Sequence, residues 1–391
     1  MKRHLTIAWL FLLLASGSGT VFMAGCGDKI ALPVAEGLFG NYRYRVESGK
    51  TWDQPIQDMV VSLGRIYVLQ SDNLTKYTST LAEALYVVSD FGDATAMAVD
   101  EGTGLVFVWD DADKFVRWYD AGTLAAVGSA QLPDVQTAVA VTLNDEGIDQ
   151  LPGASTFLYL SDTESLVVHR YAYDEFNGLI PFGILARADG DAARFVHIPA
   201  AMATDIENKL LICDQDLNRN WVIRFDGTPD TTDISTVPNV PDGLRGTAVV
   251  FEDYGCITDP ASYFVIGNAA LCQDPNWEGG VSDLDGEFNV PAGIAVDGLG
   301  RIFVADHFNS RIQVFSRIGE WEPEKLKIGL PEDIPHPTAI GVYDVHYGSS
   351  AGDVNYAAFV YVLVPELNRI VVYISKEHEA LSNVDFPPEL Q

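Results

Sequence analysis

Short apolar runs that end at Asp, Asn or Gly recur along the chain. The clearest stretch is Gly286 to Ser316, in which two apolar runs each end in an acidic residue and a third closes on Phe315. Val, Ile, Phe and Tyr are enriched in such runs, as is typical of β-strands, and few long segments carry helical periodicity. The pattern therefore predicts a repeating unit of three short strands.

The same unit is found six times. The copies are Asp58 to Tyr77, Ala96 to Tyr119, Thr137 to Tyr171, Ala201 to Phe225, Phe288 to Phe315 and Thr338 to Tyr373. Their closing aromatic residues are 42 to 90 residues apart, which favours a β-propeller over a helical solenoid. One three-stranded unit cannot bury both of its faces, whereas blades stacked around an axis bury them and protect the sheet edges. We predict an all-β, six-bladed β-propeller.

The longest interval, between Phe225 and Phe315, leaves seven blades as the alternative. Its middle has two apolar runs but lacks a third run that closes on an aromatic residue. We therefore expect residues 227–260 to be mainly an insertion in the fourth blade. In an exported protein, Cys256 and Cys272 are expected to form a disulfide there, with two unpaired thiols as the alternative. Cys213 lies in a strand-like run and is expected to be a buried free thiol.

Residues 1–25 have the layout of a secretory signal peptide, with two basic residues, a short apolar core and small residues before a cut site. The run Met23 to Cys26 resembles a bacterial lipobox, although Met23 stands where Leu is preferred; a plain secretory signal is the alternative. We expect a lipoprotein anchored in the cell envelope through acylated Cys26. Because Gly27 is not the Asp that retains enteric lipoproteins, the outer membrane is favoured over the inner one, with the protein facing the periplasm or the surface. No second long apolar segment is present, so membrane attachment is expected through lipid alone.

The mature chain is expected to divide into three parts. Residues 26–36 are a tether, residues 37–375 form the propeller, and residues 376–391 are a tail. The segment from Phe39 to Val46 reads as an outermost strand with no inner strands before it. We predict that it completes the last blade and so joins the two ends of the ring.

One copy carries a family resemblance. The stretch FNVPAGIAVDGLGRIFVADHFNSRIQVF, Phe288 to Phe315, closely resembles an NHL repeat. Elsewhere the match is partial. The Asp in the middle of the repeat is present in four copies, as Asp110, Asp162, Asp214 and Asp306. Gln70 replaces it in the first copy and Val364 in the last. The resemblance covers roughly residues 37–374 and implies a six-bladed propeller. It implies no single activity, because such propellers serve as binding scaffolds, lyases and lactonase-like enzymes.

The composition restricts the partners. The chain has 55 Asp and Glu against 24 Lys and Arg, a formal net charge of −31. This acidic protein repels nucleic-acid phosphates and favours cations or basic partners. We expect no nucleic-acid binding; the oligomeric state stays open.

In a propeller blade, the loop that enters the first strand and the loop after the second strand lie on the same face. The four repeated Asp residues at the second-strand ends are expected to support turn backbone there. The candidate ligand contacts on this face are His307, His197, His336, Trp52, Trp277, Asp216, Asp111 and Arg219. Among them His307 is peculiar to its blade. By contrast, His169 and His346 are expected to be exposed or at strand edges.

No cofactor is expected, although calcium and zinc are weak alternatives. The run Asp214 to Asn218 begins like an EF-hand loop, but Arg219 stands where that loop requires Gly. The run Asp283 to Glu287 lacks the later bidentate Glu. Zinc would need a denser cluster than the rim histidines form in the sequence.

The favoured function is therefore binding of a protein, peptide or glycan partner rather than catalysis. The alternative is a divalent-metal-dependent hydrolase or lyase with its site in the axial channel. Convergence of three or more of the rim carboxylates and histidines would favour the enzyme.

Overall fold

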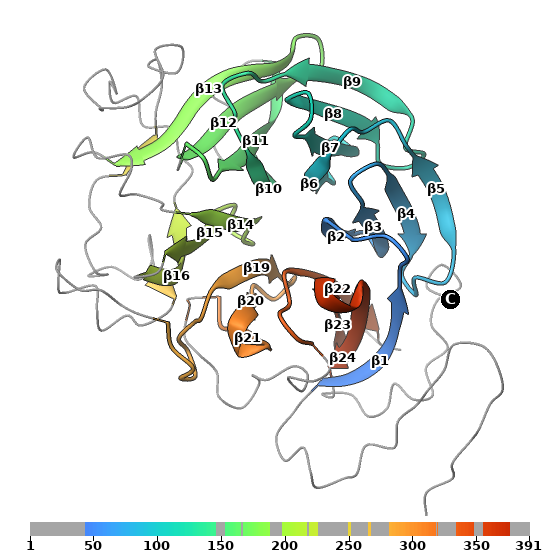
Figure 1. Cartoon of the computed structure of the whole chain (residues 1–391), viewed down its shortest axis with the longest axis vertical. Coiled ribbons are helices and arrows are strands. Elements are labelled where there is room, and N and C mark those ends of the chain that lie inside the picture. The colour runs from blue at the N-terminus through green and yellow to red at the C-terminus, as the bar shows by residue number, and fades with distance from the viewer. Residues whose placement is uncertain are drawn as a thin grey trace, which may run out of the picture. The chain divides into compact units, whose positions relative to one another are not determined.

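The described strands form six sheets around one axis, and all but one of their pairings are antiparallel (Figure 1). The structure, a computed structural model, describes residues 44–145, 153–165, 167–187, 198–216, 219–225, 249–251, 265–266, 281–317, 319, 334–347 and 355–375. All of these lie in the second of two units of the chain, Tyr42–Gln391. Within the described ranges, no helix is long and apolar enough to cross a membrane.

Each sheet is one blade, numbered along the chain. Blade one contains β2 (Asp58–Ser62), β3 (Arg65–Leu69), β4 (Leu74–Thr78) and β5 (Ala84–Val88). Blade two contains β6 (Ala94–Asp100), β7 (Leu105–Asp110), β8 (Phe115–Asp120) and β9 (Ala126–Gln131). Blade three contains β10 (Ala138–Asn144), β11 (Ala154–Asp162), β12 (Val167–Asp174) and β13 (Gly178–Arg187).

The second half of the ring follows the same plan. Blade four contains β14 (Pro199–Thr204), β15 (Leu210–Asp216), β16 (Arg219–Phe225) and β18 (Val265–Ile266). Blade five contains β19 (Pro291–Val296), β20 (Ile302–Asp306) and β21 (Arg311–Phe315), with the 3-10 turn η6 (His307–Asn309) after β20. Blade six contains β22 (Ala339–Tyr347), β23 (Asn355–Val364), the 3-10 turn η7 (Pro365–Leu367) and β24 (Arg369–Ser375). The six-bladed prediction is confirmed, and the seven-bladed alternative is wrong.

The core lies between the blades. In β7 all six side chains are buried, because blade one covers one face of the strand and blade three covers the other. Phe107 and Trp109 of blade two pack in one apolar cluster with Leu158 and Leu160 of blade three. This is why the second strands are continuous apolar runs rather than alternating ones.

The first strands of neighbouring blades contact one another around the axis, from β2 through β6, β10, β14, β19 and β22 back to β2. Small residues allow this close approach. A Cβ atom on Gly293 of β19 would collide with the carbonyl oxygen of Thr338, and one on Gly341 of β22 would collide with Val61 of β2. Glycine at these two positions sets the spacing of the inner strands.

The ring closes through β1 (Tyr44–Thr51), which pairs antiparallel with β24. The predicted closure by an N-terminal strand is confirmed, but the strand continues to Thr51 instead of ending at Val46. It extends through polar residues because β24 offers partners as far as Arg369, which pairs with Thr51. Residues 39–43 lie outside the described ranges.

The predicted insertion is described only in part. Its strand β17 (Val249–Phe251) pairs parallel with β13, so it adds a fifth strand to blade three, while β18 completes blade four. Cys256 and Cys272 lie outside the described residues. Cys213 is a buried free thiol, as predicted, and burial raises the pKa of its thiol.

Candidate binding site on the loop face

We call the end of the ring that carries the lead-in loops of the first strands and the loops after the second strands the loop face. The backbone hydrogen bonds repeat there from blade to blade. The amide of Asp111 donates to the carbonyl oxygen of Asp93 at 2.9 Å, and that of His307 donates to Val290 at 3.0 Å. Each bond joins the end of a second strand to the lead-in of the first strand. The two kinds of loop therefore lie together, as the sequence predicted.

The repeated Asp residues are scaffold. Asp110, Asp162, Asp214 and Asp306 are fully buried. The carboxylate of Asp110 accepts hydrogen bonds from the amides of Gly92 and Asp93, both at 2.8 Å. Such buried carboxylates tie the lead-in loop to the second strand, so the predicted structural role is confirmed.

Asp306 and Asp162 show that the pKa of the repeated Asp depends on its hydrogen-bond partners. Burial raises the pKa of Asp306, against the hydrogen bonds from Asn289 and Asn309 and the charge of Arg311. Burial also acts to raise the pKa of Asp162, but hydrogen bonds from His169 and the backbone outweigh it and hold this pKa below its usual range.

His169 corrects a sequence expectation. It is buried rather than exposed, with Nε2 3.2 Å from the Asp162 carboxylate. Strand β12, in which it lies, is buried on both faces, so polar residues in it cannot be assigned to a solvent side. The side chain of His346 lies outside the described residues.

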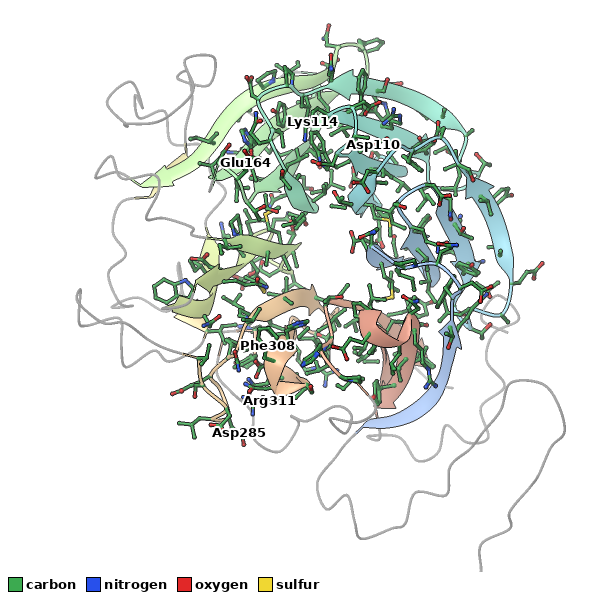
Figure 2. The ribbon with its side chains drawn as sticks, viewed as in Figure 1. Asp110, Lys114, Glu164, Asp285, Phe308 and Arg311 are labelled. Carbon is green, nitrogen blue, oxygen red and sulfur yellow. The ribbon has the colours of Figure 1, made fainter. Side chains whose placement is uncertain are left out.

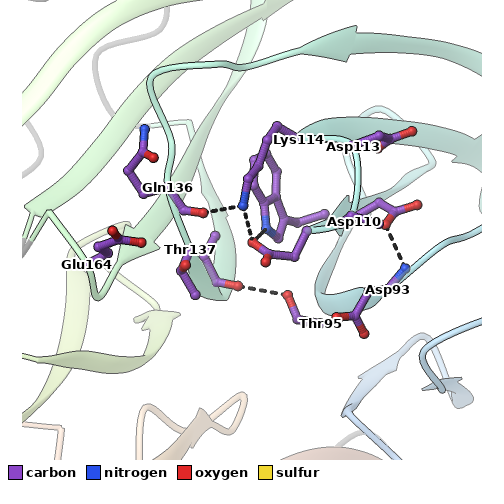
Figure 3. Close-up of polar contacts among 12 residues, drawn as sticks. Asp93, Thr95, Asp110, Asp113, Lys114, Gln136, Thr137 and Glu164 are labelled. Atoms are coloured by element: carbon purple, nitrogen blue, oxygen red, sulfur yellow. Dashed lines mark hydrogen bonds and ion pairs between the residues drawn. The ribbon is translucent and has the colours of Figure 1, made fainter.

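Blades two and three present a polar group on the loop face (Figure 3). The ammonium of Lys114 contacts the Asp111 carboxylate at 3.0 Å and the carbonyl oxygen of Gln136. Asp111 also accepts from the buried indole N–H of Trp109 at 3.2 Å. The candidate Asp111 is thus neutralised by a cation of its own loop, and the group mainly joins blade two to blade three.

Blades five and six present a different group, which we call the His–Phe–Glu cluster: His307, Phe308, His336 and Glu366. The 3-10 turn η6 supplies the first two residues, the lead-in loop to β22 supplies His336, and η7 supplies Glu366. The structure therefore brings together two predicted candidates, His307 and His336, from segments 29 residues apart.

The rings of the cluster are in contact. The His307 and His336 centroids lie 5.1 Å apart with an interplanar angle of 34°. The Phe308 ring meets His307 at 4.7 Å and His336 at 5.5 Å, both edge to face. Even so, Phe308 remains 55 % exposed. Figure 2 shows it on the blade-five side of the ring, near Arg311 and Asp285.

Hydrogen bonds fix the two imidazoles. Nδ1 of His307 lies 3.2 Å from the carbonyl oxygen of Pro337, and Nδ1 of His336 lies 2.5 Å from Oε1 of Glu366. A carbonyl or carboxylate oxygen only accepts, so we assign a proton to each Nδ1. Burial lowers the pKa of His307, and the neighbouring His336 lowers it further, so a neutral imidazole is favoured.

Backbone geometry also holds His336 in place. Its φ is +49°, in the left-handed region that only Gly, Asn and Asp adopt readily. Its amide donates to the Ser310 hydroxyl at 3.4 Å, across the boundary between blades five and six.

The other predicted ligand contacts do not belong to the His–Phe–Glu cluster. The indole N–H of Trp52 donates to the Tyr77 hydroxyl at 3.1 Å, and its ring packs edge to face on Tyr77, which gives it a packing role in blade one. Asp216 and Arg219 pair through their backbones at the ends of β15 and β16, and their side chains lie outside the described residues. His197 and Trp277 lie outside them altogether, as does Cys26.

Two residues were missed by the sequence analysis. Phe308 carries the exposed ring of the cluster, and its position between His307 and Asn309 in a turn is the signal that could have indicated it. Asp58 begins the innermost strand of blade one and accepts hydrogen bonds from the amides of Met59 and Met97. Burial raises the pKa of Asp58 to about 6.

Within the described part of the chain, no three His, Cys, Asp or Glu side chains converge closely enough to hold a metal ion. The convergence that would favour the axial-channel enzyme is thus not observed among these residues.

Comparisons with known proteins agree with the architecture. The NHL repeat family model matches residues 288–315. The chain is therefore an all-β, six-bladed propeller with an NHL repeat. No curated protein matches the sequence significantly.

The chain is similar to several solved structures. Virginiamycin B lyase from Staphylococcus aureus is 9 % identical with a TM-score of 0.46, over 84 % of this chain and 99 % of that one. Hydrazine synthase of Kuenenia stuttgartiensis is 10 % identical with a TM-score of 0.46, over 83 % and 96 %. A protein of unknown function from Bacteroides thetaiotaomicron is 12 % identical with a TM-score of 0.48, over 85 % and 72 %. At this similarity, none of them indicates what this chain binds or does.

Proposed function

We propose that this protein is a lipid-anchored binding protein of the bacterial cell envelope, which docks a protein, peptide or glycan partner on the His–Phe–Glu cluster. The observation that carries the proposal is the Phe308 ring, which is 55 % exposed yet packs edge to face against two neighbouring imidazoles. Aromatic residues, Phe among them, are enriched at the centres of protein interfaces. In blade two, by contrast, Lys114 pairs with Asp111, and Arg117 pairs with Asp110 and Asp113.

The direction of β1 shows at which end of blade six the chain enters. Tyr44 pairs with Ser375, and Thr51 pairs with Arg369, two residues after the end of η7. The chain therefore enters blade six at the end opposite to η7 and the cluster. Residues 26–43 could span roughly 60 Å when extended. An anchor at Cys26 would thus leave the loop face accessible to a partner.

Site-specific photocrosslinking tests the binding surface. Benzoylphenylalanine is placed at position 308, and a matched control is placed at position 63 in the β2–β3 turn at the opposite end, where Leu63 is 71 % exposed. We expect a discrete adduct in cells from position 308 and none from position 63. Equal adducts from both positions, or none from 308, would overturn the proposal.

The anchor is tested separately by metabolic labelling with radioactive palmitate. The wild-type chain should incorporate the label and sediment with membranes, whereas Cys26→Ser should lose both properties. A Cys26→Ser chain that still carries label would contradict lipidation at this residue.

A further inference from the structure

We propose that the His–Phe–Glu cluster recognises a cationic side chain of its partner, a guanidinium or ammonium group, with Glu366 as the counter-charge and Phe308 as the face on which the cation rests. This inference rests on the proposed function, because it names the chemistry of the partner at the same site. Three observations support it: the state of Glu366, the exposed ring, and the charge of the whole chain.

Among the described residues, one of the two carboxylate oxygens of Glu366 makes no hydrogen bond. Its side chain is 55 % exposed, and its contact is between Oε1 and His336 Nδ1. Within the described part of the chain, it makes no ion pair with Lys or Arg. Two other rim carboxylates are already paired, since Asp111 contacts Lys114 at 3.0 Å and Asp285 contacts Arg311 at 3.1 Å. Glu366 is therefore a rim carboxylate whose charge a partner can still pair.

Phe308 offers the complementary surface. Both imidazoles meet its ring edge to face, and its side chain is more than half exposed. Cations bind favourably over aromatic faces, and guanidinium groups do so while also donating hydrogen bonds to a carboxylate. A carboxylate and an aromatic ring on adjoining turns form a pair of contacts that suits such a group.

The net charge of the chain acts in the same direction. At −31, the chain attracts basic ligands over long range and repels acidic ones. Long-range attraction alone would not be specific to this cluster, so the experiment must separate it from local recognition.

The test uses the mature full-length chain in detergent and fluorescently labelled peptides, read by anisotropy at fixed ionic strength. The probes are a tetra-arginine peptide, a tetra-lysine peptide and a tetra-citrulline peptide, the last having the shape of arginine without its charge. We expect arginine to bind at least about tenfold more tightly than citrulline, as charge-assisted hydrogen bonds imply. Equal affinity for arginine and citrulline would overturn the proposal.

Matched variants separate the cluster from general attraction. Glu366→Gln should lower arginine-peptide affinity about tenfold, and Phe308→Leu, which keeps the bulk but removes the ring face, about threefold. The control is Glu164→Gln, which removes one charge from an exposed residue of the same face in blade three and should change affinity less than about twofold. Equal losses from Glu164→Gln and Glu366→Gln would mean unspecific attraction, and would overturn the site.

The outcomes also separate this inference from the proposed function. A crosslinked partner at position 308 together with equal arginine and citrulline affinities would leave the binding function standing and remove the cation site. Selective arginine binding without any crosslinked partner would support the cation site but contradict the proposal that the protein binds a partner in cells.

Discussion

Asp110 illustrates how a single buried carboxylate organises a loop. It accepts from the amides of Gly92 and Asp93 and pairs with Nη1 of Arg117 at 2.9 Å. Asp110→Asn would turn an amide group towards these donors and leave Arg117 without its buried counter-charge. We expect a loss of about 3 kcal/mol in the free energy of unfolding, measured in urea.

Asp113 provides the matched control for that variant. It pairs with the same Arg117, but its side chain is 43 % exposed. Asp113→Asn should therefore change the free energy of unfolding by less than about 1 kcal/mol. Similar losses in both variants would show that the carboxylate at the repeat position has no special structural role.

Asp58 is expected to make stability depend on pH. Its pKa is raised to about 6 by burial, whereas an unfolded Asp titrates near about 3.9. Between these values the folded chain holds a proton that the unfolded chain has lost. The contribution of Asp58 to stability is therefore greatest at low pH and falls as the pH rises from about 4 to about 6.

The titration can be followed at the Met97 amide, which donates to the Asp58 carboxylate at 2.9 Å. Its NMR chemical shift should titrate with a midpoint near 6, and Asp58→Asn should abolish that transition. A midpoint near the ordinary Asp value of about 4 would contradict the raised pKa.

At the residue scale, sequence reasoning succeeded where a position repeats and failed where a position occurs once. The four Asp residues could be assigned to scaffold because each follows an equivalent strand. Phe308 has no such counterpart, and its exposure depends on the packing of two loops that are distant in sequence. His169 was misjudged because alternation has no meaning in a strand buried on both faces.

At the element scale, the close packing of the innermost strands requires glycine at two positions. Gly293→Ala would place a Cβ atom against the Thr338 carbonyl oxygen of the next blade, which is backbone and cannot turn aside. We expect a loss of about 2 kcal/mol in the free energy of unfolding. The control is Gly102→Ala in the β6–β7 turn, where the nearest atom would be Oδ1 of Asp100 at 3.4 Å, an ordinary contact.

The control variant should change stability by less than about 0.5 kcal/mol. Equal unfolding curves for wild type and Gly293→Ala would mean that β19 and β22 can separate at little cost. That result would contradict the close inner ring.

The strands themselves could be predicted because each one corresponds to a short apolar run in the sequence. The six third strands contain the closing aromatic residues that defined the repeat, from Tyr77 in β4 to Tyr373 in β24. The parallel pairing of β17 with β13 could not be predicted, since a short apolar run does not specify its partner or its direction. The extent of β1 was also set by its partner strand rather than by its own residues.

At the scale of the whole molecule, stability is expected to depend on the pairing of β1 with β24, which joins the two ends of the described propeller. Without β1, the backbone of β24 from Arg369 to Ser375 would present an open edge, and open edges promote association between molecules. A chain that begins at Trp52 should therefore unfold at lower urea concentration than one that begins at Tyr42, and it should form larger species in size-exclusion chromatography. In the full chain the backbone nitrogen of Trp52 donates to the Asn368 carbonyl oxygen, and the terminal ammonium of the shorter chain can donate there too, so the start of blade one remains attached. Any loss then reports on the β1–β24 pairing itself, and identical unfolding midpoints in the two chains would show that the ring holds without it.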